Sequence, residues 1–217
     1  QLNGVPHLAK PPLTYWLIAL SLKTLGVNEF AARLPVALAA MGTLLAVYLL
    51  GRRAAGEACG LWAAAVLLSS VLFLGVARLV TTDMILTCWI TWSAWALWHW
   101  SESPGRTWRQ AVWFFLFLGL GLITKGPVSL LLPLFALAGM RWRSPELRIG
   151  RLGWGRGILV MLAVSLPWFV AVAWGRPEVW GYFLGRETVG RLLSEVHGRG
   201  EAWWYFVPVL AGGMLPW

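Results

Sequence analysis

Long apolar runs separated by short polar connections dominate the chain. A helix needs about 20 mostly apolar residues to cross a bilayer, and runs near that length recur along the whole sequence. Backbone polar groups in lipid must be satisfied within the segment itself, which favours helices over strands. The predicted spans are Leu34–Leu50, Gly60–Ala77, Met84–Trp100, Trp108–Thr124, Pro127–Met140, Gly157–Trp174 and one that opens at Trp203.

The segment before Leu34 follows a different pattern. Pro11 and Pro12 suit the opening of a helix, and the stretch TYWLIALSLKTLG is too short to span a bilayer comfortably. We therefore expect an amphipathic helix that lies in the membrane interface. Asn28 should cap the next helix, with Glu29 in its first turn.

Two parts follow from this pattern. Residues 1–33 form a loop with an interfacial helix, and residues 34–217 form a bundle of about seven transmembrane helices that includes a long polar loop at 175–202. The chain begins without methionine or an apolar signal segment, and it stops inside an apolar run. We expect it to be part of a longer protein, incomplete at both ends.

Composition supports an all-α polytopic membrane protein. The chain is 59% hydrophobic and only 12% charged, whereas soluble domains carry about 25% charged residues. Its 17 tryptophans suit a protein with many ring anchors at membrane–water boundaries. Cys59 and Cys88 lie in or beside apolar runs without metal-ligand or redox spacing, which favours thiols packed in the core.

The net charge of +9 does not indicate nucleic acid, because the basic residues are scattered between apolar runs. Anionic lipid is the better partner. The positive-inside rule does not decide the orientation, since each set of helix connections carries nine basic residues. One set holds Arg52, Arg53, Arg106, Arg109, Arg141, Arg143, Arg148, Arg151 and Arg156; the other holds Lys10, Lys23, Arg33, Arg78, Lys125, Arg176, Arg186, Arg191 and Arg199.

Four charged stretches in the second set could carry chemistry. Successive helices alternate in direction, so all four should lie on one membrane face. Cations gathered there suit an anionic phosphate, and a carboxylate among them suits general-base work on a hydroxyl acceptor. The combination indicates transfer from a lipid-linked donor. The residues are Lys10, Arg78, Asp83, Lys125, Arg186, Glu187 and Arg191.

Simpler interpretations apply to each residue taken alone. A lysine beside a span commonly extends to the headgroups, and an aspartate at a helix boundary commonly caps the helix. His7, His99 and His197 are isolated and lack metal-ligand spacing. It is the gathering of the charged stretches that favours a site.

Five motifs in order resemble one family. KPPLTYW with GVNEFAARLP, RLVTTDM, LITKGPVSLLLP, YFLGRETVGRL and WWYFVPVLAGGMLPW resemble bacterial integral-membrane glycosyltransferases. These are the aminoarabinose transferases of lipid A and the related dolichyl-phosphate-mannose–protein mannosyltransferase-like proteins. The resemblance covers essentially the whole chain. It implies the C-type glycosyltransferase fold, a polyprenyl-phosphate sugar donor, and the bacterial inner membrane with the Lys10 side facing the periplasm.

The resemblance also implies roles for the charged residues. Lys10 matches the family lysine that holds the donor's lipid phosphate, and Asp83 matches a functionally required acid. Further donor-site cations are matched by Lys125 and Arg191, with Arg78 and Arg186 as weaker candidates for the same phosphate region.

Two departures from the family pattern matter. The family's proposed catalytic aspartate lies upstream of KPP, and no acid precedes Glu29 here, so we expect that aspartate in a missing N-terminal part. The lipid A enzyme binds a divalent metal through a glutamate and a histidine at the positions of Ala9 and Thr188. We therefore expect no metal site, which weakens aminoarabinose and lipid A as the specific substrates.

The sequence thus predicts an inverting glycosyltransferase that moves a sugar from a polyprenyl phosphate to a lipid or protein acceptor. Residues 1–217 alone should be inactive. A flippase for the lipid-linked sugar could use the same cations, but it predicts charges in broken helices near the bilayer midplane rather than at span ends. A non-catalytic membrane scaffold would tolerate loss of Lys10 and Lys125.

Overall fold

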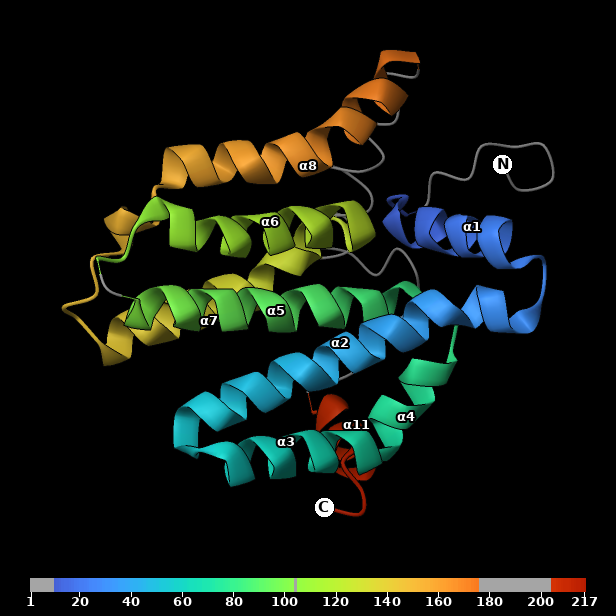
Figure 1. Cartoon of the computed structure of the whole chain (residues 1–217), viewed down its shortest axis with the longest axis horizontal. Helices are drawn as coiled ribbons and strands as arrows, with labels where there is room; N and C mark the ends of the chain where they lie inside the picture. The colour runs from blue at the N-terminus through green and yellow to red at the C-terminus, as the bar shows by residue number, and fades with distance from the viewer. Residues whose placement is uncertain (1–9, 104, 176–203) are drawn as a thin grey trace.

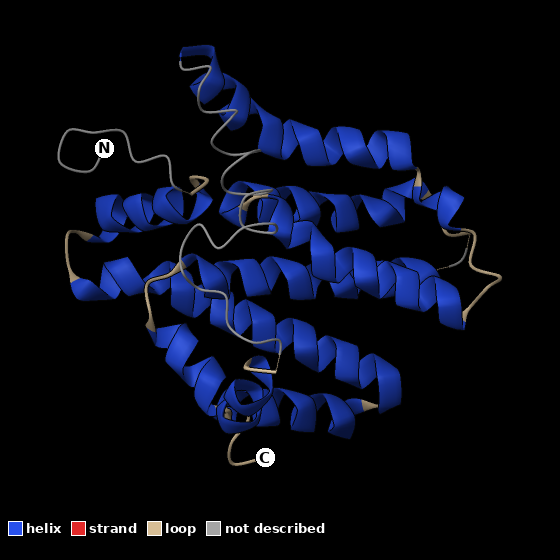
Figure 2. Ribbon diagram, turned by 180° about the vertical axis from the view of Figure 1, so that it is seen from behind, coloured by secondary structure: helices blue, strands red, loops and turns tan. Residues whose placement is uncertain are grey.

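The computed structural model describes residues 10–103, 105–175 and 204–217, and the regular structure within them is entirely helical (Figures 1 and 2). The all-α prediction is confirmed for these residues. The elements are α1 Leu13–Leu25, α2 Glu29–Ala55, α3 Glu57–Ser69, α4 Val71–Arg78, α5 Thr82–Glu102, α6 Trp108–Lys125, the 3₁₀ helix η1 Pro127–Leu130, α7 Leu131–Arg143, the 3₁₀ helix η2 Ile149–Leu152, α8 Trp154–Gly175 and α11 Phe206–Gly213.

The long helices lie side by side. In Figure 1 the order across the molecule is α8, α6, α5, α2 and α3, and each of these neighbours is in contact with the next. α7 packs behind α5, and α1 contacts both α2 and α6. α5 and α6 therefore form the centre of the bundle as an antiparallel hairpin with a short connection.

α2 is longer than the predicted span Leu34–Leu50. Asn28 caps its first turn as predicted, because the Asn28 side chain accepts a hydrogen bond from the Ala31 amide at 2.8 Å. Glu29 and Arg33 then form an ion pair at 2.5 Å across one helical turn. Charges spaced this way support a helix instead of ending it, so the predicted boundary at residues 33–34 falls inside α2.

The predicted span Gly60–Ala77 is not one straight helix. It consists of α3 and α4, which are bent by 66° at Ser70. The Ser70 hydroxyl donates to the Val66 carbonyl at 2.7 Å, an internal bond typical of a kinked helix. The Val71 amide instead donates to Leu215 at 3.2 Å, so the segment after α11 satisfies a group that the break exposes.

By length and apolar composition, two of the described helices could each cross a membrane. These are α2 and α8, and the bent pair α3–α4 is a third if it forms a single span. The remaining spans of the predicted seven stay predictions. In the last predicted span, the described part is the eight-residue α11 followed by a turn.

α1 differs from the amphipathic helix that we expected. Its buried residues are the small and polar Thr14 and Ser21, whereas Tyr15, Trp16 and Leu20 are exposed. These apolar side chains thus face away from the protein, while Leu17 packs against a core cluster. An outward apolar face on a 13-residue helix suits contact with lipid at the interface.

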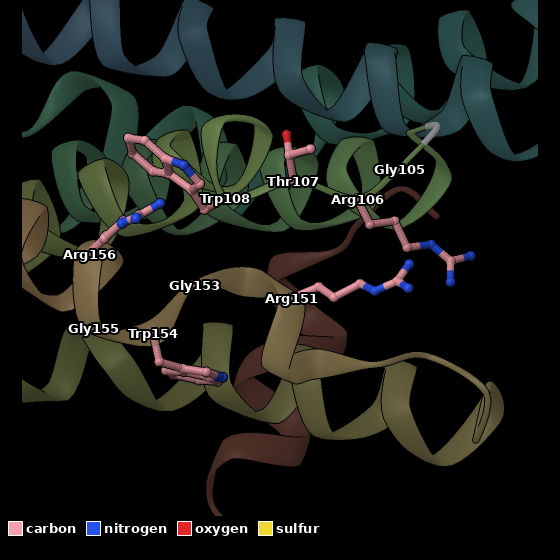
Figure 3. A pocket seen from close by; sticks show the side chains of 9 residues that line it. All are labelled: Gly105, Arg106, Thr107, Trp108, Arg151, Gly153, Trp154, Gly155 and Arg156. Carbon is pink, nitrogen blue, oxygen red and sulfur yellow. The ribbon is translucent and has the colours of Figure 1, made fainter.

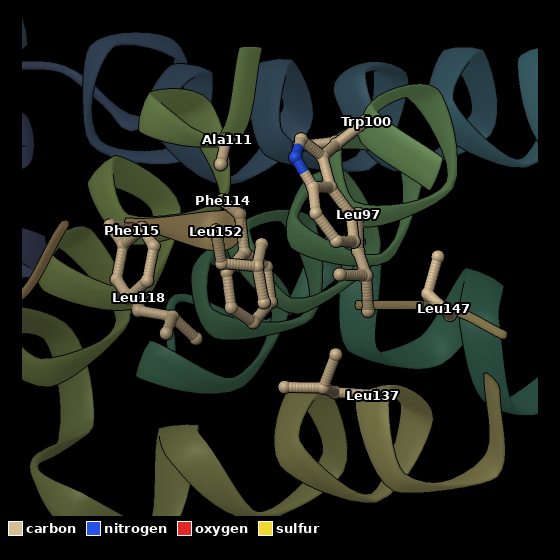
Figure 4. Close-up of a cluster of buried hydrophobic side chains, with 10 residues drawn as sticks. Leu97, Trp100, Ala111, Phe114, Phe115, Leu118, Leu137, Leu147 and Leu152 are labelled. Atoms are coloured by element: carbon tan, nitrogen blue, oxygen red, sulfur yellow. The ribbon is translucent and has the colours of Figure 1, made fainter. Parts of the chain in front are cut away.

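A hydrophobic core joins one end of the α5–α6 hairpin to its neighbours (Figure 4). Its aromatic centre is Trp100 of α5 with Phe114 and Phe115 of α6, all at most 1% exposed. Leu137 of α7 and Leu152 of η2 close it from the other sides. This core fixes the hairpin at the end where α5 finishes and α6 begins. The full cluster is Ala96, Leu97, Trp100, Ala111, Phe114, Phe115, Leu118, Leu137, Leu147 and Leu152.

Candidate functional site

Asp83 and Lys125 meet at the other end of the α5–α6 hairpin. Asp83 lies in the first turn of α5, and Lys125 is the last residue of α6. The Lys125 ammonium donates a hydrogen bond to Asp83 Oδ1, which makes an ion pair between residues 42 positions apart. The antiparallel packing of α5 and α6 therefore brings two of the predicted site residues together.

Local sequence signals place both charges at this end. Thr81 caps α5, because its hydroxyl accepts from the Asp83 amide at 3.4 Å. α6 stops at Lys125 because Gly126 has a φ of 82°, a conformation that favours glycine, and Pro127 then begins η1. A carboxylate in a first turn and an ammonium in a last turn both complement the helix dipole.

The ion pair is partly open to its surroundings. The side chains of Lys125 and Asp83 are 27% and 49% exposed. An ammonium has three N–H donors and a carboxylate has two acceptor oxygens. Within the described residues, Asp83 Oδ1 is the only hydrogen-bond partner of the Lys125 ammonium. The pair can therefore hold an incoming anion through the remaining ammonium donors while Asp83 keeps the lysine in place.

Lys10 lies at the same end of the molecule. It directly precedes the buried prolines 11 and 12, which open α1, and its side chain is partly buried. α1 contacts α6, and Figure 1 shows the start of α1 beside the end of α6. One turn further on, Thr14 is 2% exposed and its hydroxyl has no hydrogen-bond partner among the described residues. Two predicted cations and one unpaired buried hydroxyl thus belong to this end.

The other predicted residues are less closely joined. Arg78 ends α4 on the same side of the bundle and is exposed. It makes no ion pair with the other described residues. Arg186, Arg191, Ala9 and Thr188 lie outside the described residues, as do Glu187 and most of the loop 175–202. The described part of the chain contains no group of three or more metal-ligating side chains.

A second charged cluster, at the far end of the hairpin, was not predicted from the sequence. Glu102 at the end of α5 accepts hydrogen bonds from Arg53 of α2 and from Trp98. Arg53 Nη1 also lies 3.3 Å from His99 Nδ1, and the His99 ring stacks on the Trp95 ring. Nothing in the sequence relates residues 49 positions apart, so this cluster is a product of α2 packing on α5.

This cluster makes stability depend on pH. Burial acts to raise the pKa of Glu102, but hydrogen bonds from Arg53 and Trp98 and the Arg53 charge outweigh it, so the pKa is lowered. A lowered folded-state pKa stabilises the fold above the unfolded-state pKa of about 4.3. That contribution is lost as pH falls through the folded-state pKa.

We therefore expect Glu102→Gln to lower the Tm at about pH 7, and the difference from the parent to close below about pH 4. Thermal unfolding in neutral detergent measures it. Glu29→Gln, which removes one partner of the exposed pair with Arg33, is the control and should change Tm little. A Tm difference that stays constant down to about pH 3 would contradict the assignment.

An open pocket of about 570 Å³ also lies at the far end of the hairpin (Figure 3). None of the predicted site residues that the structure describes contributes to its lining. It is formed by the α5–α6 connection and the turn between η2 and α8.

The chain is similar in sequence to known transferases. A transferase of Pseudomonas aeruginosa (strain LESB58), undecaprenyl phosphate-alpha-4-amino-4-deoxy-L-arabinose arabinosyl transferase, is 34% identical over 99% of this chain. The transferase of the same name from Shewanella sediminis is 31% identical over 99% of it. This chain spans 40% of the length of each of these two relatives.

Solved structures match as well. The crystal structure of ArnT from Cupriavidus metallidurans bound to undecaprenyl phosphate superposes with a TM-score of 0.90 at 26% identity. The match covers 99% of this chain and 40% of that one. The apo structure of the same protein gives a TM-score of 0.83 at 24% identity. The predicted membrane glycosyltransferase fold is thus confirmed.

A family model extends over most of the chain. The model described as dolichyl-phosphate-mannose-protein mannosyltransferase matches residues 9–174. That range includes Lys10, Asp83 and Lys125. The five ordered motifs pointed to the same relatives, and this resemblance is confirmed. The chain therefore belongs to the dolichyl-phosphate-mannose-protein mannosyltransferase family.

Proposed function

We propose that the protein transfers a sugar from a polyprenyl-phosphate donor to an acceptor at the membrane face where Lys10, Asp83 and Lys125 lie. The single observation that carries the proposal is that α1, α5 and α6 bring these three residues to one end of the bundle. A lipid phosphate at that end would meet two ammonium groups, one of which is held by a carboxylate. The likeness to a transferase structure bound to undecaprenyl phosphate supports this donor class.

The transfer is a substitution at the sugar's anomeric carbon. The acceptor hydroxyl oxygen forms the new bond to this carbon, and the bond from the carbon to the phosphate oxygen breaks. Polyprenyl phosphate leaves with the electron pair, and the hydroxyl proton passes to a general base. The family resemblance supports a base upstream of Lys10, and we therefore assign Asp83 the role of organising the site.

Lys10 and Lys125 stabilise the charge that develops on the leaving phosphate. Ammonium groups fixed before the reaction stabilise such charge without reorganising, which is commonly the largest single contribution to catalysis. Asp83 positions the Lys125 ammonium. Arg78, and Arg186 and Arg191 outside the described residues, supply further positive charge for the same phosphate region.

The proposal extends to the substrates and the location. The names of the relatives favour an undecaprenyl-phosphate-linked aminoarabinose donor and a lipid A-like or other periplasmic acceptor. Ala9 and Thr188 at the family's metal-ligand positions argue for a reaction that proceeds without that metal. The active face is the periplasmic side of the bacterial inner membrane, which the donor carrier and the family both favour.

Lys10→Ala tests the function directly. The full reading frame that contains residues 1–217 is expressed, and sugar transfer from radiolabelled polyprenyl-phosphate donors is measured in membranes. Removing a phosphate-stabilising ammonium should lower turnover about 10²-fold. The matched control is Lys23→Ala, which changes an exposed lysine in the last turn of α1 and should leave turnover unchanged.

Two results would overturn the proposal. Full turnover by Lys10→Ala would remove the lysine from the site. Movement of the donor across vesicles without any transfer would favour a flippase instead.

A further inference from the structure

The open pocket at the far end of the hairpin is lined by arginines and tryptophans. Its lining includes the arginines 106, 151 and 156 together with Trp108 and Trp154. Among the residues that the structure describes, no acidic side chain contributes to the lining. In Figure 3 the side chains of Arg106 and Arg151 extend toward the same side of the pocket. Guanidinium groups gathered without a carboxylate repel one another, and a bound phosphate offsets that repulsion.

The acid nearest to the pocket residues along the sequence, Glu102, does not neutralise these arginines. Glu102 is already engaged by Arg53 and Trp98. Within the described residues, the Arg151 side chain makes no hydrogen bond or ion pair. The Arg106 side chain bonds only through Nε, which donates to the Ser101 carbonyl at 2.9 Å. The Ser101 bond orients the Arg106 guanidinium and leaves its terminal amino groups available.

The backbone around the pocket is shaped to present these groups. Arg106 has a φ of 47°, a left-handed backbone conformation that few residues other than glycine adopt. Gly153 has a φ of 68° and lies so close to Trp108 that an added Cβ would be 2.6 Å from the Trp108 Cβ. Arg156 lies over the Trp108 ring at 5.2 Å. The close turn at Gly153 thus holds one arginine against an aromatic wall of the pocket.

The first turns of two helices, each with a tryptophan, also lie at the pocket. α6 begins at Trp108 and α8 begins at Trp154, so two long helices direct their positive ends to it. α8 is long and apolar enough to cross a membrane, which places its first turn at a boundary between lipid and water. Tryptophans are enriched at such boundaries.

We propose that this pocket binds the phosphate headgroup of an anionic phospholipid in the leaflet opposite the candidate donor site. Basic pockets between membrane helices are suited to lipid headgroups. Arg106 and Arg151 contact the phosphate oxygens, and the tryptophans contact the glycerol and upper acyl region. The ligand is a resident lipid that ties the α5–α6 connection to the start of α8.

The test measures lipid binding, so it does not depend on transferase activity. Protein from the full reading frame is purified in neutral detergent and titrated with fluorescent phosphatidylglycerol. The double variant Arg106→Gln/Arg151→Gln should bind about tenfold more weakly or worse. Arg143→Gln/Arg148→Gln removes the same charge from exposed positions outside the pocket and should stay within about twofold of the parent.

Further measurements distinguish a lipid headgroup from free phosphate and show whether a loss of binding is due to misfolding. Arg151→Gln alone changes a side chain without partners among the described residues, and it should fold and still lose most of the binding. Equal losses in the pocket and control variants would overturn the proposal, because charge alone would explain them. Inorganic phosphate that binds the parent but not Arg151→Gln, while phosphatidylglycerol binds both alike, would also overturn it in favour of a soluble anion.

Discussion

Replacing Lys125 by alanine is expected to lower sugar transfer about 10²-fold, as for Lys10. The Lys125 ammonium is held by Asp83 at the end of α6, so its loss removes a positive charge and leaves a carboxylate facing the donor phosphate. Asp83→Asn should have a smaller effect, about tenfold, since it releases the lysine without removing it. The measurement is the initial rate over a range of donor concentrations.

A double-mutant cycle distinguishes positioning from direct action. If Asp83 acts through Lys125, Asp83→Asn added to Lys125→Ala lowers the rate no further. Additive losses would instead mean that Asp83 touches the substrates itself. Arg33→Ala breaks the exposed Glu29–Arg33 pair at an i,i+4 spacing and serves as the control, with little expected effect. Unchanged transfer by Lys125→Ala would remove the pair from the donor site.

The second large effect is on stability, from Gly157→Ala in α8. An added Cβ at Gly157 would lie 2.2 Å from the Phe115 ring, which is 1% exposed in the core of Figure 4. A buried ring held on all sides cannot move away, so we expect a loss of about 1–3 kcal/mol in the free energy of unfolding. Thermal unfolding of the purified protein, followed by tryptophan fluorescence, measures it as a lower Tm.

Gly155→Ala is the matched control two residues earlier in the same helix. An added Cβ at Gly155 meets no atom within 4 Å, and alanine favours a helix over glycine by up to about 1 kcal/mol. The control should therefore match or exceed the parent in Tm. A Gly157→Ala variant as stable as Gly155→Ala would show that α8 can move off Phe115.

Elements with local signals could be predicted from the sequence. Asn28 marked the start of α2, and the TKGP stretch marked the end of α6, because a capping side chain and a glycine–proline pair act on their own neighbours. Asp83 was expected at the boundary before the span Met84–Trp100; it lies in the first turn of α5, and Thr81 is the capping residue. Alternation of helix direction was then enough to predict that Asp83 and Lys125 share one end.

Features that depend on packing between distant segments could not be predicted. The ion pair itself requires the register of α5 against α6, and the bend at Ser70 accompanies contact with the segment near Leu215. The outward apolar face of α1 depends on which side its neighbours cover. The arginine pocket was not predicted, because its residues come from separate connections that resemble ordinary basic loops in the sequence.

The outward face of α1 has a consequence for how the donor is found. Tyr15 and Trp16 are exposed on a helix that starts only three residues after Lys10. Aromatic rings of this kind settle at the level of the lipid headgroups. In this position, α1 would hold the Lys10 ammonium at the same depth in the membrane as the phosphates of the surrounding lipids. In the proposed function, a polyprenyl phosphate would reach Lys10 by lateral diffusion within its own leaflet, so the search for substrate would be confined to two dimensions.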